Sequence, residues 1–116
     1  MAADIPTGHF PINCYILKRR NMFIVSLKYK CGLEKVDKHL DAHVAYLNEE
    51  YANGNFIASG RKIPRTGGII LSCVKNKEEL ESIISKDPFN KAGIAEYDII
   101  EFIPRRVAEG YEILQK

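Results

Sequence analysis

The amino-acid sequence predicts one α+β domain in which four strands and two helices follow one another in the order β-α-β-β-α-β. Apolar residues recur every second residue in some segments, as in strands, and every three or four residues in others, as in helices. Asn-Gly, Gly-Gly and Pro residues separate these segments. The length of 116 residues matches one domain and allows a buried core without disulfides or metal.

The first strand is predicted over residues 23–30, where one face carries every second residue: Phe23, Val25, Leu27 and Tyr29. A helix is predicted over residues 33–53, because apolar residues at spacings of three and four form one stripe: Val36, Leu40, Val44, Leu47 and Tyr51. Gly54 follows this helix and favours its end, since Gly readily adopts the left-handed conformation of a helix C-terminus. Residues 56–58 form a short second strand.

The second half of the domain begins with a loop over residues 60–65, in which Pro64 bars regular strand pairing. The third strand is predicted over residues 69–74. A second helix begins at Asn76, which is a favourable N-cap and has Glu79 three residues later in a capping-box pattern.

A short helical turn follows at Asp87, with Asp as its cap and Pro88 at its first position, and Gly93 ends it. The last strand is predicted over residues 97–103 and a terminal helix over residues 105–115. Two right-handed crossovers then place both long helices on one face of a four-stranded antiparallel sheet. The sequence therefore predicts the ferredoxin-like arrangement.

Two helices cover only one face of such a sheet, although several predicted strands are apolar on both faces. The last strand carries Tyr97, Ile99 and Ile103 on one face, and its other face carries Ile100 and Phe102. The uncovered face would expose a large apolar patch to water. We therefore expect a homodimer in which two sheets pack face to face.

Residues 1–21 differ from the rest of the chain and are predicted to be an N-terminal extension of a domain that spans residues 22–116. The extension is either a native arm or an upstream segment from a different start codon. It holds three basic residues and one acidic residue, which accounts for the net charge of +2, so that the domain itself is neutral. A neutral domain argues against nucleic acid as the main partner.

The sequence carries no sign of a membrane protein or of a secreted one. No apolar run approaches the length of a membrane span, and the first residues lack the pattern of a signal peptide. The three cysteines form no C-x-x-C, which argues against a disulfide framework and a thiolate zinc site. This cysteine usage favours a cytoplasmic location.

His43 and Asp87 are the candidate catalytic residues. His43 aligns with the apolar stripe of the long predicted helix, so it points toward the sheet, where an imidazole can exchange protons near neutral pH. The alternative is a core histidine bonded to a backbone carbonyl. Asp87 is explained by its place as a helix cap. A carboxylate beside His43 would also fix the imidazole tautomer and support proton transfer, and both roles can coexist.

Ser59, Gly60 and Arg61 are candidate substrate-binding residues at the end of the second strand. Gly60 suits a tight turn or a close approach of a ligand to the backbone, and Arg61 could attract an anionic substrate. A solvated loop explains these residues equally well. His39 lies one turn before His43, but no further ligand completes a metal site, so no metal is predicted.

Several segments in this order resemble the YciI-like family of YCII-related domains: residues 22–30, 41–47, 58–60, 68–71 and 87–93. The resemblance covers about residues 22–104. It implies dimeric α+β barrels with the ferredoxin-like fold and a His–Asp pair in a pocket, at the positions of His43 and Asp87. One class of members is a dehydrochlorinase of a chlorinated hydroxyhydroquinone. The family often has Gly-Pro after the second strand where this chain has Gly60-Arg61, a departure at the rim of the implied pocket.

The residues and the resemblance together predict a cofactor-independent lyase or isomerase that acts on a small anionic or phenolic molecule. His43 would be the general acid or base, and Asp87 would orient its imidazole. The main alternative is a non-catalytic small-molecule sensor or binding module, and a cofactorless monooxygenase is a further one. An RNA-binding domain is disfavoured, because the third strand has no aromatic residue for base stacking.

Overall fold

The computed structural model describes residues 21–115, which form four strands, four α-helices and one 3₁₀-helix. In chain order these are Met22–Tyr29 (β1), Leu33–Lys38 (α2), Leu40–Ala52 (α3), Phe56–Arg61 (β2), Gly67–Ser72 (β3), Lys77–Ile84 (α4), Pro88–Lys91 (α5), Ala95–Phe102 (β4) and Glu112–Gln115 (η1). Apart from Asn21, the predicted extension over residues 1–21 lies outside the described residues. The domain boundary at Met22 therefore stays a prediction.

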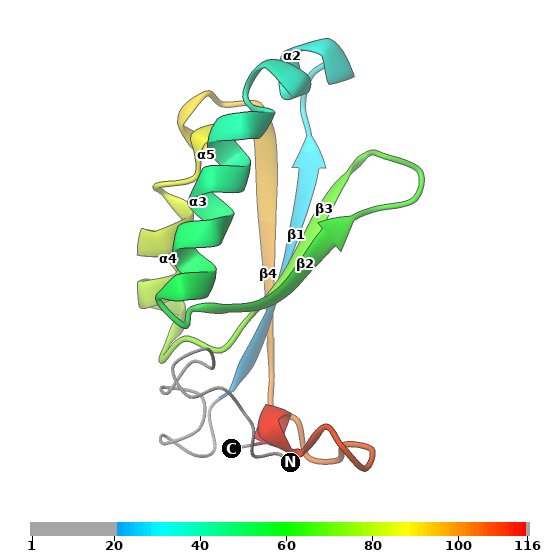
Figure 1. The fold of residues 1–116 in the computed structure, drawn as a ribbon, viewed down its shortest axis with the longest axis vertical. Helices are drawn as coiled ribbons and strands as arrows, with labels where there is room; N and C mark the ends of the chain where they lie inside the picture. The colour runs from blue at the N-terminus through cyan, green and yellow to red at the C-terminus, as the bar shows by residue number, and fades with distance from the viewer. Residues whose placement is uncertain (1–20, 116) are drawn as a thin grey trace.

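The four strands form one antiparallel sheet in the order β2-β3-β1-β4. The helices α3, α4 and α5 lie together on one side of this sheet (Figure 1). The chain passes from β1 to β2 through α2 and α3, and from β3 to β4 through α4 and α5. This is the ferredoxin-like arrangement, and the predicted fold class is confirmed.

The core lies between the helices and the face of β1 that carries Phe23, Val25 and Leu27, all of which are buried. Since β1 pairs with β3 on one side and β4 on the other, it occupies the centre of the sheet. The helices contribute buried apolar residues against this face: Val36, Tyr46, Leu80, Ile83, Ile84 and Phe89. Burying a side chain of this kind is worth about 1.5–3 kcal/mol, so this layer fixes the position of the helices over the sheet.

The prediction of one continuous helix over residues 33–53 is wrong, because the chain breaks at His39 into α2 and α3. His39 has φ −105° and ψ 4°, outside the helical region. The predicted stripe continues along α3 only in part, since Leu40, Leu47 and Tyr51 are partly buried against the core. The buried residues of α3 are His43, Tyr46 and Glu50, whereas Val44, predicted to face the core, is 44% exposed.

The hairpin between β2 and β3 is longer than predicted. β2 continues to Arg61, which pairs with Gly68, and an irregularity between Phe56 and Ala58 shifts the register. Gly60 therefore lies inside a strand and not in a tight turn. How far a hairpin extends depends on how its two strands pair with each other, which the loop residues alone do not report.

The predicted terminal helix over residues 105–115 is limited to the 3₁₀-helix η1. Gly110 has a φ of +95°, a left-handed conformation that interrupts a right-handed helix. The short helical turn at Asp87 and the helix that begins after Asn76 both form as predicted. The Asn76 side chain accepts a hydrogen bond from the backbone N–H of Glu79 at 2.8 Å.

The face of the sheet away from the helices carries apolar side chains on three strands. The register places Ile24 opposite Leu71 on one neighbouring strand and opposite Ile100 on the other. Ile100 and Phe102 are 50% and 42% exposed. Leu114 of η1 packs against Met22 near one end of this face. The homodimer stays a prediction that rests on this face.

Within residues 21–115, no helix combines the length and the apolar character needed to cross a membrane.

Candidate functional site

His43 and Asp87 are in contact inside the domain. His43 lies one turn into α3, and its side chain is buried against the sheet side of the helix. Its Nδ1 atom lies 2.8 Å from Oδ1 of Asp87, which directly precedes α5. The two residues are 44 positions apart in the sequence, and the packing of α3 against α5 brings them together.

Asp87 is fully buried and its carboxylate has several hydrogen-bond donors. Oδ1 accepts the backbone N–H of Phe89 at 3.0 Å, which is the N-cap bond of α5. Oδ2 accepts the hydroxyl of Tyr97 at 2.6 Å. Oδ1 of Asp87 therefore caps the helix and contacts His43 at the same time, since one carboxylate oxygen can accept two hydrogen bonds.

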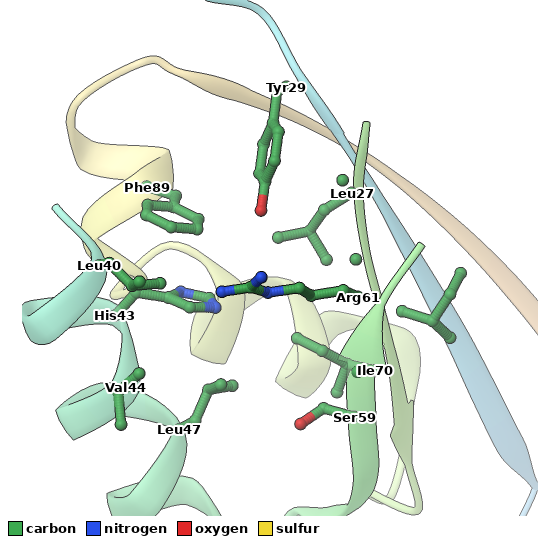
Figure 2. A pocket seen from close by; sticks show the side chains of 14 residues that line it. Leu27, Tyr29, Leu40, His43, Val44, Leu47, Ser59, Arg61, Ile70 and Phe89 are labelled. Atoms are coloured by element: carbon green, nitrogen blue, oxygen red, sulfur yellow. The ribbon is translucent and has the colours of Figure 1, made fainter. Parts of the chain in front are cut away.

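The contact with Asp87 assigns the proton of the neutral imidazole to Nδ1, since an ionised carboxylate can only accept hydrogen bonds. Nε2 then carries the free lone pair. Figure 2 shows the ring of His43 at the cavity between α3 and the sheet, with one nitrogen toward the open space. The pair therefore has the arrangement of an oriented base whose free nitrogen meets a ligand.

Aromatic rings hold the imidazole in this orientation. The ring of Phe89 stacks on His43 with a centroid distance of 4.0 Å and an interplanar angle of 5°. Tyr46 lies at 6.1 Å from the same ring and donates its hydroxyl to the backbone carbonyl of Ile83 at 2.9 Å. A side chain that is stacked and hydrogen-bonded in this way loses little freedom when a ligand binds.

Burial raises the pKa of Tyr97 well above its usual range, and the negative charge of Asp87 and the hydrogen bond to it raise it further. Burial and then the charge of Asp87 also raise the pKa of Tyr46. Both phenols therefore stay protonated at any physiological pH. Tyr97 remains a hydrogen-bond donor to Asp87 throughout this range.

A cavity of about 210 Å³ opens beside His43, between α3 and the strands β1, β3 and β2 (Figure 2). Its walls are mainly apolar and include Leu27, Leu40, Val44, Leu47, Ile70 and Phe89. An apolar cavity of about 150 Å³ is large enough to hold benzene. The volume at His43 therefore suits a molecule the size of one substituted ring.

The three residues predicted to bind substrate all line this cavity from β2. The hydroxyl of Ser59 is hydrogen-bonded to the hydroxyl of Tyr51 at 2.6 Å, so it is already engaged. Gly60 offers only its backbone, and a Cβ at this position would meet no atom within 4 Å. Arg61 extends its guanidinium across the cavity toward His43 (Figure 2). Their roles in binding stay predictions.

Two tyrosines of the site were not identified from the sequence. Tyr29 lies at the end of β1 and points its hydroxyl into the cavity (Figure 2). The sequence did carry a sign of this role, because Tyr29 adds a polar hydroxyl at the end of the apolar face of the first strand. Tyr97 was placed on the correct face of the last strand, but its bond to Asp87 depends on a tertiary contact that no local pattern reports.

His39, the other histidine of the described residues, is not among the residues that line the cavity. Over residues 21–115, no group of three or more His, Cys, Asp and Glu side chains is arranged to hold a metal ion.

Comparisons with known proteins agree with this architecture. The family described as YCII-related domain matches residues 22–103. Among solved structures, the chain is similar to 5-chloro-2-hydroxyhydroquinone dehydrochlorinase from Burkholderia phenoliruptrix AC1100, in complex with 2,5-dihydroxybenzoquinone. The TM-score is 0.61 and the identity 22%, over 78% of this chain and 97% of that chain. A comparison with curated proteins gives no match.

Proposed function

We propose a function for this chain from the premise that it belongs to the YCII-related domain family. The protein is an enzyme that acts on a small molecule in the cavity beside His43, as a lyase or isomerase that needs no cofactor. A cytoplasmic location and a homodimer are part of this proposal.

The observation that carries the proposal is the 2.8 Å contact between Nδ1 of His43 and Asp87, with Nε2 left for the cavity. Nε2 takes a proton from the substrate as general base. Asp87 keeps the imidazole in the required tautomer and stabilises the positive charge that forms on it. The electron pair of the broken bond then expels a leaving group in a lyase. In an isomerase the same proton returns at another carbon.

The structural neighbour supports the class of substrate. That protein is a dehydrochlorinase, and its complex holds 2,5-dihydroxybenzoquinone, a quinone of one ring. The cavity of about 210 Å³ in this chain has room for one substituted ring, and its apolar walls suit such a molecule. A ring-sized phenol, quinone or enol is therefore the first substrate class to assay.

The test compares turnover by the wild-type protein with that of His43→Gln. The assay follows 5-chloro-2-hydroxyhydroquinone and a panel of single-ring phenols and hydroxybenzoates by NMR in deuterated buffer. Removing a general base costs about 10²–10⁴-fold in rate, so we expect a loss of that size in the variant. His39→Gln is the matched control and should keep the wild-type rate. Equal turnover by wild type and His43→Gln would remove His43 from the mechanism.

A non-catalytic binding module is the alternative function. The same cavity would hold a ligand without changing it. Compounds that raise the melting temperature of the wild-type protein are incubated with it and then recovered. Recovery of every bound compound unchanged, in ordinary and in deuterated buffer, would favour the binding module over the enzyme.

A further inference from the structure

Arg61 gives the cavity a positive charge that no acidic side chain of its lining balances. Of the described residues that line the cavity, none is Asp or Glu. The carboxylate of Asp87 lies behind His43 and is occupied by His43, Phe89 and Tyr97. The lining is therefore neutral or positive in every protonation state of His43.

The guanidinium of Arg61 is available to a ligand. Among the described residues, the ion pairs of the hairpin region involve the neighbouring Arg65, whose guanidinium donates to Asp37 at 2.6 Å, and not Arg61. Arg61 stands at the end of β2 and reaches over the cavity from the sheet side (Figure 2). His43 faces the same space from α3, on the opposite wall.

We infer that Arg61 selects substrates that carry an anionic group, and that the substrate is a planar, single-ring anion such as a carboxylate or an ionised phenol. The inference rests on the proposed function in one respect, that this cavity is the substrate site. A guanidinium binds carboxylate and phenolate oxygens through charge-assisted hydrogen bonds, and its fork fits a carboxylate in two-point contact. The apolar walls hold the ring of the same molecule.

A pair of probes that differ only in charge tests this selection. Benzoate and benzamide have nearly the same size and shape, but only benzoate is an anion. Binding of each to the wild-type protein is measured by titration of the backbone amide resonances of Leu27 and Ile70, which line the cavity. We expect benzoate to bind about five- to tenfold more tightly than benzamide at low salt, as one accessible charge contact allows.

Two substitutions show whether the preference comes from Arg61. Arg61→Met removes the guanidinium at an exposed strand end, where the fold tolerates it. Lys28→Met removes the same charge from an exposed position of β1 that does not line the cavity. Arg61→Met should bind benzoate and benzamide equally, while Lys28→Met should keep the wild-type preference. Because Arg61 is accessible to solvent, the wild-type preference should also shrink as sodium chloride rises from about 20 to 500 mM.

Several outcomes would overturn the inference. It fails if the wild-type protein binds benzamide as tightly as benzoate, if neither probe shifts the cavity resonances, or if Arg61→Met keeps the preference. The test is independent of turnover. A preference lost only in Arg61→Met, together with equal turnover by wild type and His43→Gln, would leave the anion selection standing and remove the proposed catalysis. A missing preference together with a His43-dependent reaction would remove only the anion selection.

Discussion

Asp87 joins three hydrogen-bond donors of different kinds on its two oxygens. The backbone N–H of Phe89 can only donate, whereas the hydroxyl of Tyr97 can either donate or accept. Nδ1 of His43 shares Oδ1 with Phe89. Because the N–H of Phe89 can only donate, the atom at the Oδ1 position must be an acceptor. The hydroxyl of Tyr97 can pair with either an acceptor or a donor at the Oδ2 position.

This arrangement predicts the result of Asp87→Asn. The amide oxygen must take the Oδ1 position, because the N–H of Phe89 needs an acceptor there, and the amide nitrogen can then donate to the hydroxyl of Tyr97. His43 should keep its proton on Nδ1, which the ¹⁵N resonances of the imidazole would show. The variant should lose roughly 1–2 kcal/mol of unfolding free energy, since the hydrogen bonds remain without the charge.

Turnover by Asp87→Asn then reports on the charge of Asp87 alone. An unchanged tautomer with a rate well below wild type would assign that loss to the missing stabilisation of the imidazolium. The double variant Asp87→Asn with Tyr97→Phe removes the acceptor for the amide and should be less stable than the two single changes predict together. A proton found on Nε2 in Asp87→Asn would contradict this account of the network.

The raised pKa of Tyr97 leads to a prediction about the stability of the fold at alkaline pH. Its pKa is raised in the folded protein, so the folded state keeps this proton above pH 10, where the unfolded chain loses it. Its contribution to stability is therefore complete below about pH 10 and is lost as the pH rises further. One proton corresponds to about 1.4 kcal/mol per pH unit, so Tyr97→Phe should show a shallower alkaline loss than the wild-type protein.

Urea unfolding at pH 7, 9, 10 and 11 measures this difference. At pH 7, Tyr97→Phe should be less stable than the wild-type protein by roughly 1.5–3 kcal/mol, because a hydrogen bond to a charged group is lost. Tyr111, which is 59% exposed, provides the matched control. Tyr111→Phe should follow the wild-type curve. Parallel curves for Tyr97→Phe and wild type above pH 10 would show that Tyr97 is not the group responsible.

At the scale of helices and strands, the sequence correctly predicted the features that depend on contacts between residues close in sequence. Asn76 and Asp87 were identified as caps because their side chains bond to backbone N–H groups two or three residues away. His43 was placed correctly toward the sheet, and its pairing with Asp87 was implied by the family resemblance. The break at His39 was missed, since neither Pro nor Gly marks it in the sequence.

The strand ends were missed for a different reason. β2 reaches Arg61 and β3 begins at Gly67 because these strands pair with each other, and the closing residues of a hairpin depend on both partners. The same argument applies to the tyrosine hydroxyls of the site. Tyr29 and Tyr97 were placed on the right face by the two-residue period, but their partners come from other elements.

The surroundings of two glycines in the β2–β3 hairpin predict opposite effects of an alanine substitution on stability. A Cβ at Gly67 would clash with the backbone carbonyl of Leu27, which the ladder holds in place. Gly67→Ala should therefore cost about 1–3 kcal/mol of unfolding free energy. A Cβ at Gly60 meets no atom within 4 Å, and Gly60→Ala should be neutral or stabilise by up to about 1 kcal/mol. Urea unfolding of both variants checks the pair, and equal stabilities would contradict the clash.

At the scale of the whole molecule, the sheet has a covered face and an open one. The covered face builds the core and, at the ends of β1, β2 and β3, the cavity beside His43. The open face presents apolar residues from neighbouring strands: Ile24, Ile69, Leu71, Ile100 and Phe102. A contiguous apolar surface of this kind is typical of a protein interface.

We therefore predict a homodimer through the open face, and Ile100→Glu should separate it. Ile100 is half exposed on β4, and a carboxylate there would be buried unpaired between two sheets, which costs several kcal/mol per charge. Ile63→Glu is the matched control, because Ile63 is 97% exposed in the β2–β3 connection, away from this face. In sedimentation-velocity runs of the full chain, wild type and Ile63→Glu should sediment as dimers and Ile100→Glu as a monomer with the same circular dichroism spectrum. A wild-type protein that stays monomeric at a concentration of about 100 μM would contradict an interface of ordinary affinity on this face.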